Sequence, residues 1–473
     1  MIALRDRRPF SLDLKLDDLD AYLPQRYENP LEIRLLAVDP RYRNTTVLLD
    51  LMLRCVDLAK SRAYDIGLIS GTTRQLKLYE RLGFRPFGPL VGTSDAMFQP
   101  MYLTWEALEK RVGDLLLRRS RAQQTGNFLP GPVALSKSVR KAVTRDPISH
   151  RSVEFEALYG RVKMRLKSLT GAEDVAVLQG SGTLANDVIS AQLSLLGSHG
   201  LVLANGEFGE RLVDHAERFE LDFNVYRVDW GKAFNFAKLD RLIAADRVSW
   251  LWAVHCETST GGLNDIVALK CLSKRHGFKL CMDCVSSIGA VEVDLIGVHL
   301  ASGANGKALG ALPGLCFVFT GSLIPTQHRL PRYLDISLYL AGVPFTMSSN
   351  LFAALESALD QAGNERYQRI AGAARRFREQ MAEGGLEIVG DTSVASPHVM
   401  TIALPKNIDS SALARELADR GLLVAYASDY LHQRNWIQVC LMSEFTTSSL
   451  DRLAWELTNR IQDSRAAEGQ PAA

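Results

Sequence analysis

Lys307 and Asp283 are the two charged residues whose surroundings in the sequence best suit chemistry. Small residues flank the lysine in SGANGKALGALPG at 302–314, and the aspartate ends the apolar run FKLCMD at 278–283. A lone carboxylate at the end of a buried strand is costly unless a cation pairs with it. We therefore expect a positively charged group beside Asp283 and a reactive amine, with room around it, at Lys307.

Polar and aromatic groups follow three other apolar runs. Ligands of an open parallel sheet bind beyond the carboxyl ends of its strands. The turn containing Ser181, Gly182 and Thr183 enters a helix, where free backbone N–H groups and the helix dipole favour a phosphate. A tight turn that simply needs glycine is the alternative interpretation. Phe208 follows the next run, and Thr258 lies in a cluster of hydroxyl residues after another.

Pyridoxal phosphate requires this combination of groups. It needs an amine to bond its aldehyde, a carboxylate to keep its ring nitrogen protonated, an aromatic face and a phosphate cradle. Each residue by itself could be a cap or a turn. Together they predict a pyridoxal phosphate site.

The elements that must position these residues alternate between strand and helix from residue 128 onward. Runs that are apolar on both faces and joined by helical segments predict a mainly parallel sheet covered by helices, which is an α/β fold. The expected strands are VAVLQG at 175–180, GLVLANG at 200–206, FNVYRVDW at 223–230, SWLWAVHC at 249–256, FKLCMDCVSS at 278–287 and GLCFVFTG at 314–321.

The chain on either side of this sheet divides into smaller parts. A long helical stretch from residue 350, with strands at 398–405 and 436–442 and a helix at 410–421, predicts a small C-terminal α+β domain. Near the N-terminus, strands at 30–40 and 64–70 alternate with helices at 45–63 and 72–84. We assign 1–110 to an N-terminal domain, 111–126 to a linker, 127–370 to the large domain, 371–462 to the small domain and 463–473 to a disordered tail.

Composition indicates a small-molecule partner. The 473 residues include 55 basic and 53 acidic side chains, interleaved along the chain, which does not suit nucleic acid or an anionic membrane. The N-terminus lacks the apolar core of a signal peptide, and seven scattered cysteines fit a reducing cytoplasm. Cys281 and Cys284 form a C-x-x-C within one apolar run without a second ligand pair, so we expect no metal site.

Five segments resemble the class V aminotransferases, a branch of the fold-type I pyridoxal phosphate enzymes. They are FLPGP at 128–132, GSGTLANDV at 180–188, HCETSTGGLNDI at 255–266, DCVSSIGAVEVDL at 283–295 and SGANGKALGALPG at 302–314. The resemblance implies an aminotransferase that uses an amino donor and an oxoacid acceptor, with a lyase or desulfurase of the same fold as the alternative. A desulfurase would need a nucleophilic cysteine on a mobile loop, and none of the seven lies in an evident one.

The resemblance also implies residue roles. Lys307 would bond the cofactor and carry protons, and Asp283 would pair with the ring nitrogen. Ser181, Gly182 and Thr183 would hold the phosphate, Phe208 and Val285 would cover the two ring faces, and Thr258 would contact the side of the ring that bears the 3-hydroxyl group. The family forms homodimers, and Thr346 in GVPFTMSSN would reach the phosphate of the partner subunit.

One family feature is missing from the sequence. The family holds the substrate's acid group with an arginine in the pattern R-I-G-x-M-G, a planar fork that binds two oxygens. Here the matching strand reads QVCLMS, with Gln438 in that place. Either Arg434 replaces the missing arginine, or the substrate lacks a simple α-carboxylate. The alignment of QVCLMS with the family's R-I-G-x-M-G strand could also be shifted by a few residues. Arg434 would then be a surface charge.

The N-terminal domain resembles the second half of a GNAT-type acyltransferase. The resemblance lies in AVDPRYRN before a helix and in LKLYERLGFRPFG. The family places glycines where the pyrophosphate of acyl-CoA approaches the backbone, whereas RNTTVL at 43–48 has none, and no counterpart of the family's first elements is expected before residue 31. We expect a degenerate or truncated module, with a bifunctional aminotransferase–N-acyltransferase that binds acyl-CoA as the alternative.

Overall fold

The chain folds into two compact units, residues 1–123 and 124–473. The computed structural model describes residues 2–23, 27–36, 54–55, 58–59, 61–93, 96–108 and 126–467. The loop at 43–48, most of the helix expected at 45–63 and residues 111–125 of the expected linker lie outside these described residues.

The N-terminal unit contains a six-stranded sheet with the order β1-β2-β3-β6-β4 and β5 paired to β6. β2 and β3 match the two predicted strands and pair in parallel. β1 was not expected, because a four-residue run carries no periodic pattern; it pairs antiparallel with β2. The elements are β1 (Ile2–Arg5), α1 (Leu19–Tyr22), β2 (Pro30–Leu36), β3 (Ile66–Thr72), η2 (Thr73–Gln75), α3 (Leu76–Arg81), β4 (Arg85–Pro86), β5 (Val91–Thr93) and β6 (Ala96–Leu103).

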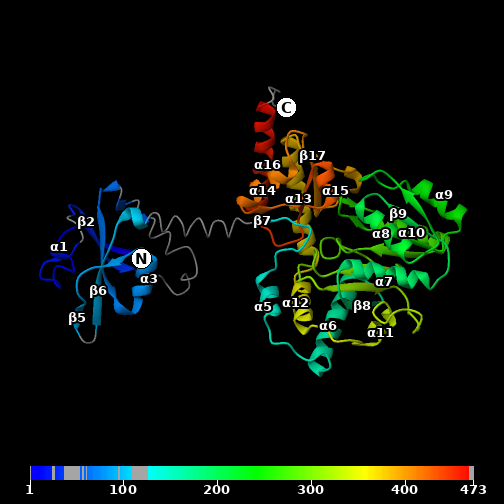
Figure 1. Ribbon diagram of the computed structural model, residues 1–473, viewed down its shortest axis with the longest axis horizontal. Coiled ribbons are helices and arrows are strands. Elements are labelled where there is room, and N and C mark those ends of the chain that lie inside the picture. Colours follow the sequence, from blue (N-terminus) through cyan, green and yellow to red (C-terminus); the bar gives the residue numbers. More distant parts are fainter. Residues whose placement is uncertain are drawn as a thin grey trace. The chain divides into compact units, whose positions relative to one another are not determined.

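A seven-stranded sheet with the order β10-β9-β11-β14-β15-β16-β8 forms the centre of the larger unit (Figure 1). All neighbouring pairs are parallel except those of β16, which runs antiparallel to both β15 and β8. Six of these strands were predicted, and β15 was not among them because LASGA has little bulk. The strands are β8 (Asp174–Gln179), β9 (Gly200–Ala204), β10 (Phe223–Arg227), β11 (Trp250–Val254), β14 (Lys279–Asp283), β15 (Leu300–Ala304) and β16 (Leu315–Thr320).

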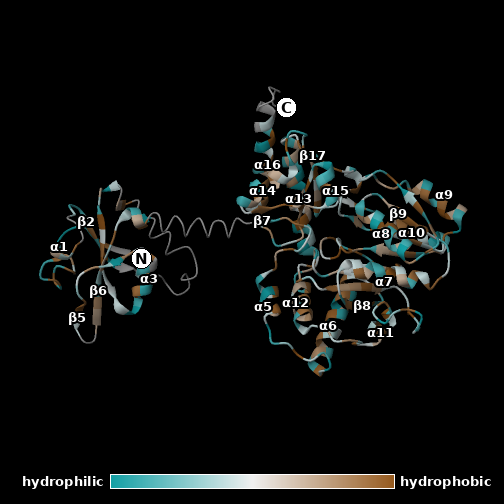
Figure 2. Ribbon diagram, in the orientation of Figure 1, coloured by the Kyte–Doolittle hydropathy of each residue, from teal (hydrophilic) through white to brown (hydrophobic). Residues whose placement is uncertain are grey.

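Helices pack against this sheet and bury its side chains. Figure 2 shows hydrophobic residues concentrated along the strands, and Trp250, Trp252 and Phe317 are among the largest fully buried side chains. The sequence marks several helix ends: Ser152 and Asp265 cap α6 and α10, and both helices end at a glycine with positive φ. The helices are α5 (Lys137–Val143), α6 (Val153–Thr170), α7 (Gly182–Ser194), α8 (Glu207–Arg218), α9 (Phe236–Asp246), α10 (Ile266–His276), α11 (Ile336–Ala341) and α12 (Ser349–Leu359).

The C-terminal part of the larger unit is an α+β arrangement around an antiparallel sheet, β17-β18-β20. The long helical stretch expected from residue 350 is two helices, because the chain breaks at Gly363, where φ is +141°. The last helix continues to Ala467, so the first residues of the expected tail are helical. The elements are α13 (Asn364–Glu383), β17 (Glu387–Ile388), β18 (Val399–Ala403), α14 (Ser410–Asp419), α15 (Asp429–Arg434), β20 (Trp436–Cys440) and α16 (Thr447–Ala467), with β19 (Leu422–Leu423) paired to β7 (Gly126–Asn127).

Two buried histidines contact adjacent serines after β14, and one of them, His398, joins this arrangement to the main sheet. The Nδ1 atom of His255, just after β11, lies 2.9 Å from the hydroxyl of Ser287. His398, just before β18, donates from Nε2 to the carbonyl of Ser286 at 2.8 Å. Burial lowers the pKa of His255 to about 4 and that of His398 to about 3.

Stability should therefore fall with acidification. Below about pH 6.5 the unfolded chain binds protons at these histidines while the folded protein does not, so each residue lowers the free energy of unfolding by up to about 1.4 kcal/mol per pH unit. Urea titrations between pH 7.5 and 4.5 measure this slope. His255→Gln should make the slope shallower, whereas His432→Gln, on an exposed part of α15, should not. Equal slopes in all three proteins would contradict the assignment.

Candidate active site

A cavity of about 190 Å³ lies beyond the carboxyl ends of the central strands. It brings together eight residues predicted from the sequence, which come from distant parts of the chain. They are Ser181, Gly182, Thr183, Phe208, Thr258, Asp283, Val285 and Lys307.

The first turn of α7 forms one wall of the cavity. Ser181 is the N-cap residue, and its side chain makes no capping hydrogen bond, so the N–H groups of the turn remain available for an anion. A Cβ atom at Gly182 would lie 2.8 Å from both methyl carbons of Val285. The glycine thus allows Val285 to pack directly against the first turn of α7.

Asp283 ends β14 and is 7% exposed. Its Oδ2 accepts a hydrogen bond from Asn186 Nδ2 at 2.8 Å, and its Oδ1 accepts one from the backbone N–H of Val285 at 2.9 Å. Burial raises the pKa of the carboxyl, while both hydrogen bonds favour the ionised form and lower it. A positively charged group in the cavity would complete the stabilisation of this carboxylate.

Lys307 follows β15 in a turn with little space for larger residues. Gly289 has φ of +93°, and a Cβ atom there would lie 2.8 Å from the backbone nitrogen of Leu309. Burial lowers the pKa of Lys307, the charge of Arg211 lowers it further, and Asp283 opposes the shift. A larger share of the amine is therefore neutral, which is the nucleophilic form.

Glu257 also supports this site and was not predicted from the sequence. It is fully buried, and its carboxylate accepts hydrogen bonds from the backbone N–H groups of Phe208 at 3.2 Å and Gly209 at 2.9 Å. The start of α8 is therefore held by a side chain that lies 49 positions away from Phe208. No local sequence signal connects these residues.

Arg211 and His215 also line the cavity and were not predicted. They follow Phe208 at helical spacing along α8, which places the three side chains on one face of the helix. That spacing was the available signal. His215 is buried, and its Nδ1 lies 2.8 Å from Asp187 Oδ1.

Gln438, predicted to contact the substrate, does not line the cavity. It is fully buried, and its Nε2 donates to the carbonyl of Thr258 and, at 2.8 Å, to the hydroxyl of Thr401. The hydroxyl of Thr258 in turn donates to Ser286 at 2.7 Å. Gln438 is therefore placed to hold the wall that carries Thr258, behind the cavity.

Arg434 lies outside the cavity as well. Its guanidinium carbon is 3.9 Å from the centre of the Trp230 ring and 5.5 Å from that of Trp436, which is a cation–π arrangement. The structure therefore does not show either predicted substrate contact, because both side chains have other partners. Thr346 is exposed on the single chain and does not line the cavity either.

The cysteines near the cavity are poorly suited to nucleophilic attack. Cys256 lines the wall, and burial raises its pKa to about 12; burial also raises the pKa of the Cys440 thiol. Cys281 and Cys284 lie in the hydrophobic core. Among the residues that the structure describes, no group of three or more histidine, cysteine or acidic side chains is arranged to hold a metal ion.

Comparisons with known proteins agree with this geometry. No protein-family model matches the chain. A 2-aminoethylphosphonate–pyruvate transaminase of Pseudomonas aeruginosa is 32% identical over 298 residues, which are 59% of this chain and 80% of the relative. The chain belongs to the class V aminotransferases. The soluble hydrogenase 42 kDa subunit of Anabaena cylindrica is also 32% identical, over 301 residues, 59% of this chain and 78% of that protein.

A solved structure supports the same assignment. The alanine–glyoxylate aminotransferase of Nostoc sp. has a TM-score of 0.66 at 27% identity, over 71% of this chain and 95% of that one. This aminotransferase thus uses pyridoxal 5′-phosphate, and the cavity suits the cofactor, because an uncapped helix start, a buried carboxylate and an amine line the same space. No helix in the described part of the chain is long and apolar enough to span a bilayer.

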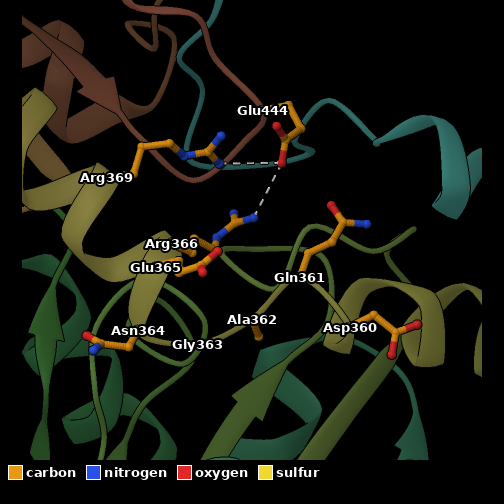
Figure 3. Close-up of a pocket in the computed structure, with 9 residues that line it drawn as sticks. All are labelled: Asp360, Gln361, Ala362, Gly363, Asn364, Glu365, Arg366, Arg369 and Glu444. Carbon is orange, nitrogen blue, oxygen red and sulfur yellow. Dashed lines mark ion pairs between the residues drawn. The ribbon is translucent and has the colours of Figure 1, made fainter.

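A second cavity of the aminotransferase lies where α12 leads into α13 (Figure 3). Arg366 and Arg369 point toward Glu444 there, each with a nitrogen 3.6 Å from Glu444 Oε1. Arg366 is 7% exposed, and its Nη2 donates at 2.8 Å to the carbonyls of Ala308 and Met442. This arginine therefore fixes the turn that carries Lys307.

Replacement of Arg366 should destabilise the aminotransferase. Arg366→Met removes charge-assisted hydrogen bonds from two buried carbonyls, and we expect the free energy of unfolding to fall by about 2–4 kcal/mol in urea titrations. Arg369→Met is a matched control, because Arg369 makes the same contact with Glu444 but is 46% exposed, and it should cost less than about 1 kcal/mol. Similar losses in both variants would show that the carbonyl contacts contribute little.

Proposed function

We propose that this aminotransferase transfers an amino group between a small amino compound and an oxoacid at the cavity around Lys307. The observation that carries the proposal is the convergence of Lys307, Asp283, Phe208 and the start of α7 on one space. A lyase or desulfurase has less support, because the only cysteine lining the cavity among the described residues has a raised pKa. The names of the relatives suggest 2-aminoethylphosphonate or alanine as amino donors.

Each residue has a role that follows from its position. Pyridoxal phosphate supplies an electron-withdrawing ring, which favours loss of a proton from the bound donor. Lys307 would hold the cofactor through its Nζ, and once the donor's amine had displaced it, the freed Nζ would move that proton. Asp283 would keep the ring nitrogen protonated, Phe208 and Val285 would cover the ring, Thr258 would contact its 3-hydroxyl side, and Ser181, Gly182 and Thr183 would hold the phosphate.

The proposed assembly is a homodimer in which each site uses Thr346 of the partner subunit. Thr346 is exposed on the single chain, and its carbonyl accepts a hydrogen bond from Gln179 at 3.3 Å. Gln179 ends β8, immediately before the turn that leads into α7. A second copy would therefore meet Thr346 close to the proposed phosphate site, and a twofold dimer is the commonest closed assembly.

The N-terminal unit has a structural or docking role in this proposal. Its resemblance to a GNAT-type acyltransferase rests on short segments, and the sequence at 43–48 lacks the glycines that acyl-CoA binding requires. Saturable binding of acetyl-CoA in calorimetry would favour the bifunctional alternative over this role.

Lys307 and Asp283 can be tested separately. Lys307→Ala should abolish both turnover and the borohydride-stable attachment of the cofactor to the chain. Asp283→Asn should keep the attachment but lower turnover by about two orders of magnitude, because an electrostatic partner of the reacting group is lost. Lys274→Ala, on an exposed face of α10, should behave like the wild type. A cofactor adduct on another lysine in the wild type would refute the assignment.

Two inactive variants should restore activity when combined. If each site takes Lys307 from one subunit and Thr346 from the other, a mixed dimer of Lys307→Ala and Thr346→Asp has one intact site. Mixing the two variants under conditions of subunit exchange should recover activity that neither has alone. No recovery in demonstrated mixed dimers, or a fully active monomer in sedimentation, would rule out the shared site.

A further inference from the structure

Arg211 lies one turn after Phe208 on α8, at the cavity that holds Lys307. Its guanidinium carbon is 4.8 Å from the centre of the Phe208 ring. Its Nε lies 3.1 Å from Glu207 Oε1, and the side chain is 53% exposed. Within the described part of the chain, its two terminal nitrogens make no hydrogen bond, so the fork is free to bind another group.

The charge of Arg211 acts inside the cavity. Its side chain and that of Lys307 line the same space, and its charge adds to the effect of burial in lowering the pKa of Lys307. Apart from Lys307 and His215, Arg211 is the only basic residue that lines the cavity among the described residues. Lys307 is needed for the cofactor, and His215 is paired with Asp187.

The two residues predicted to bind the substrate are not available to bind an acidic group in the cavity. The amide nitrogen of Gln438 is bound to Thr258 and Thr401, and Arg434 is stacked on Trp230. An acidic substrate group that enters the cavity therefore meets Arg211 as the available fork.

We propose that Arg211 binds the acidic group of the amino donor, a carboxylate or a phosphonate, and so selects acidic donors over neutral amines. The inference rests on the proposed function of the cavity. Glu207 holds Nε and leaves the two terminal nitrogens to bind two oxygens at once. The start of α7 remains the site for the cofactor's own phosphate, so two anion sites serve two different groups.

The test measures amino transfer from three donors to the holoenzyme. Donor half-reactions with 2-aminoethylphosphonate, alanine and alaninamide are followed by the visible absorbance of the cofactor. Arg211→Gln should lower kcat/KM for the two acidic donors by about ten- to a hundredfold, as expected for loss of a charge-assisted pair. The value for alaninamide should change less than about twofold. Whichever acidic donor loses more identifies the anion that the fork prefers.

Binding without reaction provides a second readout. Ethylphosphonate and propionate lack an amine, and calorimetry should show that Arg211→Gln weakens their binding to the holoenzyme about tenfold or more. Arg211→Lys keeps the charge without the fork and should fall between the two proteins. Arg218→Gln is the matched control, because Arg218 forms the same i,i+4 pair with Asp214 on α8 but lies outside the cavity.

The outcomes separate this inference from the proposed function. If Arg211→Gln leaves anion binding unchanged, or lowers activity equally for all donors, the inference is overturned. Loss of the cofactor from Arg211→Gln would assign Arg211 to the cofactor's phosphate and also overturn it. If the wild-type holoenzyme binds the anions through Arg211 but transfers no amino group from any donor, the proposed function fails while anion binding by Arg211 stands.

Discussion

The buried negative charge of Asp283 is the constraint on which the active site depends. An ionised carboxylate removed from water is stabilised only by hydrogen bonds and by a nearby positive charge. Asn186 and the backbone of Val285 supply the hydrogen bonds. The remaining stabilisation would come from a cation in the cavity, and the protonated ring nitrogen of the proposed cofactor arrangement would be such a cation.

A second buried carboxylate, Glu257, organises another part of the cavity wall. It holds the start of α8 through Phe208 and Gly209, and its neighbour Thr258 is held by Gln438 from the C-terminal sheet. The aromatic face and the hydroxyl wall are thus positioned by one short segment after β11. Rigid support of this kind keeps reacting groups aligned without further movement when the substrate binds.

The sequence predicted the residues of the cavity better than the contacts behind them. Strands such as β8 and β14 are continuous apolar runs, and the groups that follow them carry their own chemical signal. The contact from Glu257 to Phe208 and the contacts of Arg366 with Ala308 and Met442 join residues far apart in the chain, which no local pattern indicates. Strand β15 was not predicted either, because its small residues resemble those of a loop.

Gln438 stands where the family has its substrate-binding arginine, but its side chain has a different role in this structure. A glutamine in place of an expected arginine suggested an altered substrate contact, but its amide serves the polar network around Thr258 and Thr401. Arg434, which is close in sequence, is held by aromatic rings instead. The sequence therefore placed Gln438 near the cavity, but it did not indicate that the side chain would bond to Thr258 and Thr401.

The guanidinium of Arg366 links the part of the larger unit that holds the seven-stranded sheet to its C-terminal part. It is rigid and planar, and it donates hydrogen bonds at once to the carbonyl of Ala308, beside Lys307, and to that of Met442, after β20. The helix that carries it begins at the backbone break at Gly363. A rotation of the C-terminal sheet about this break must lengthen one of the two bonds or displace the lysine turn, so the angle between the two parts and the position of the amine change together.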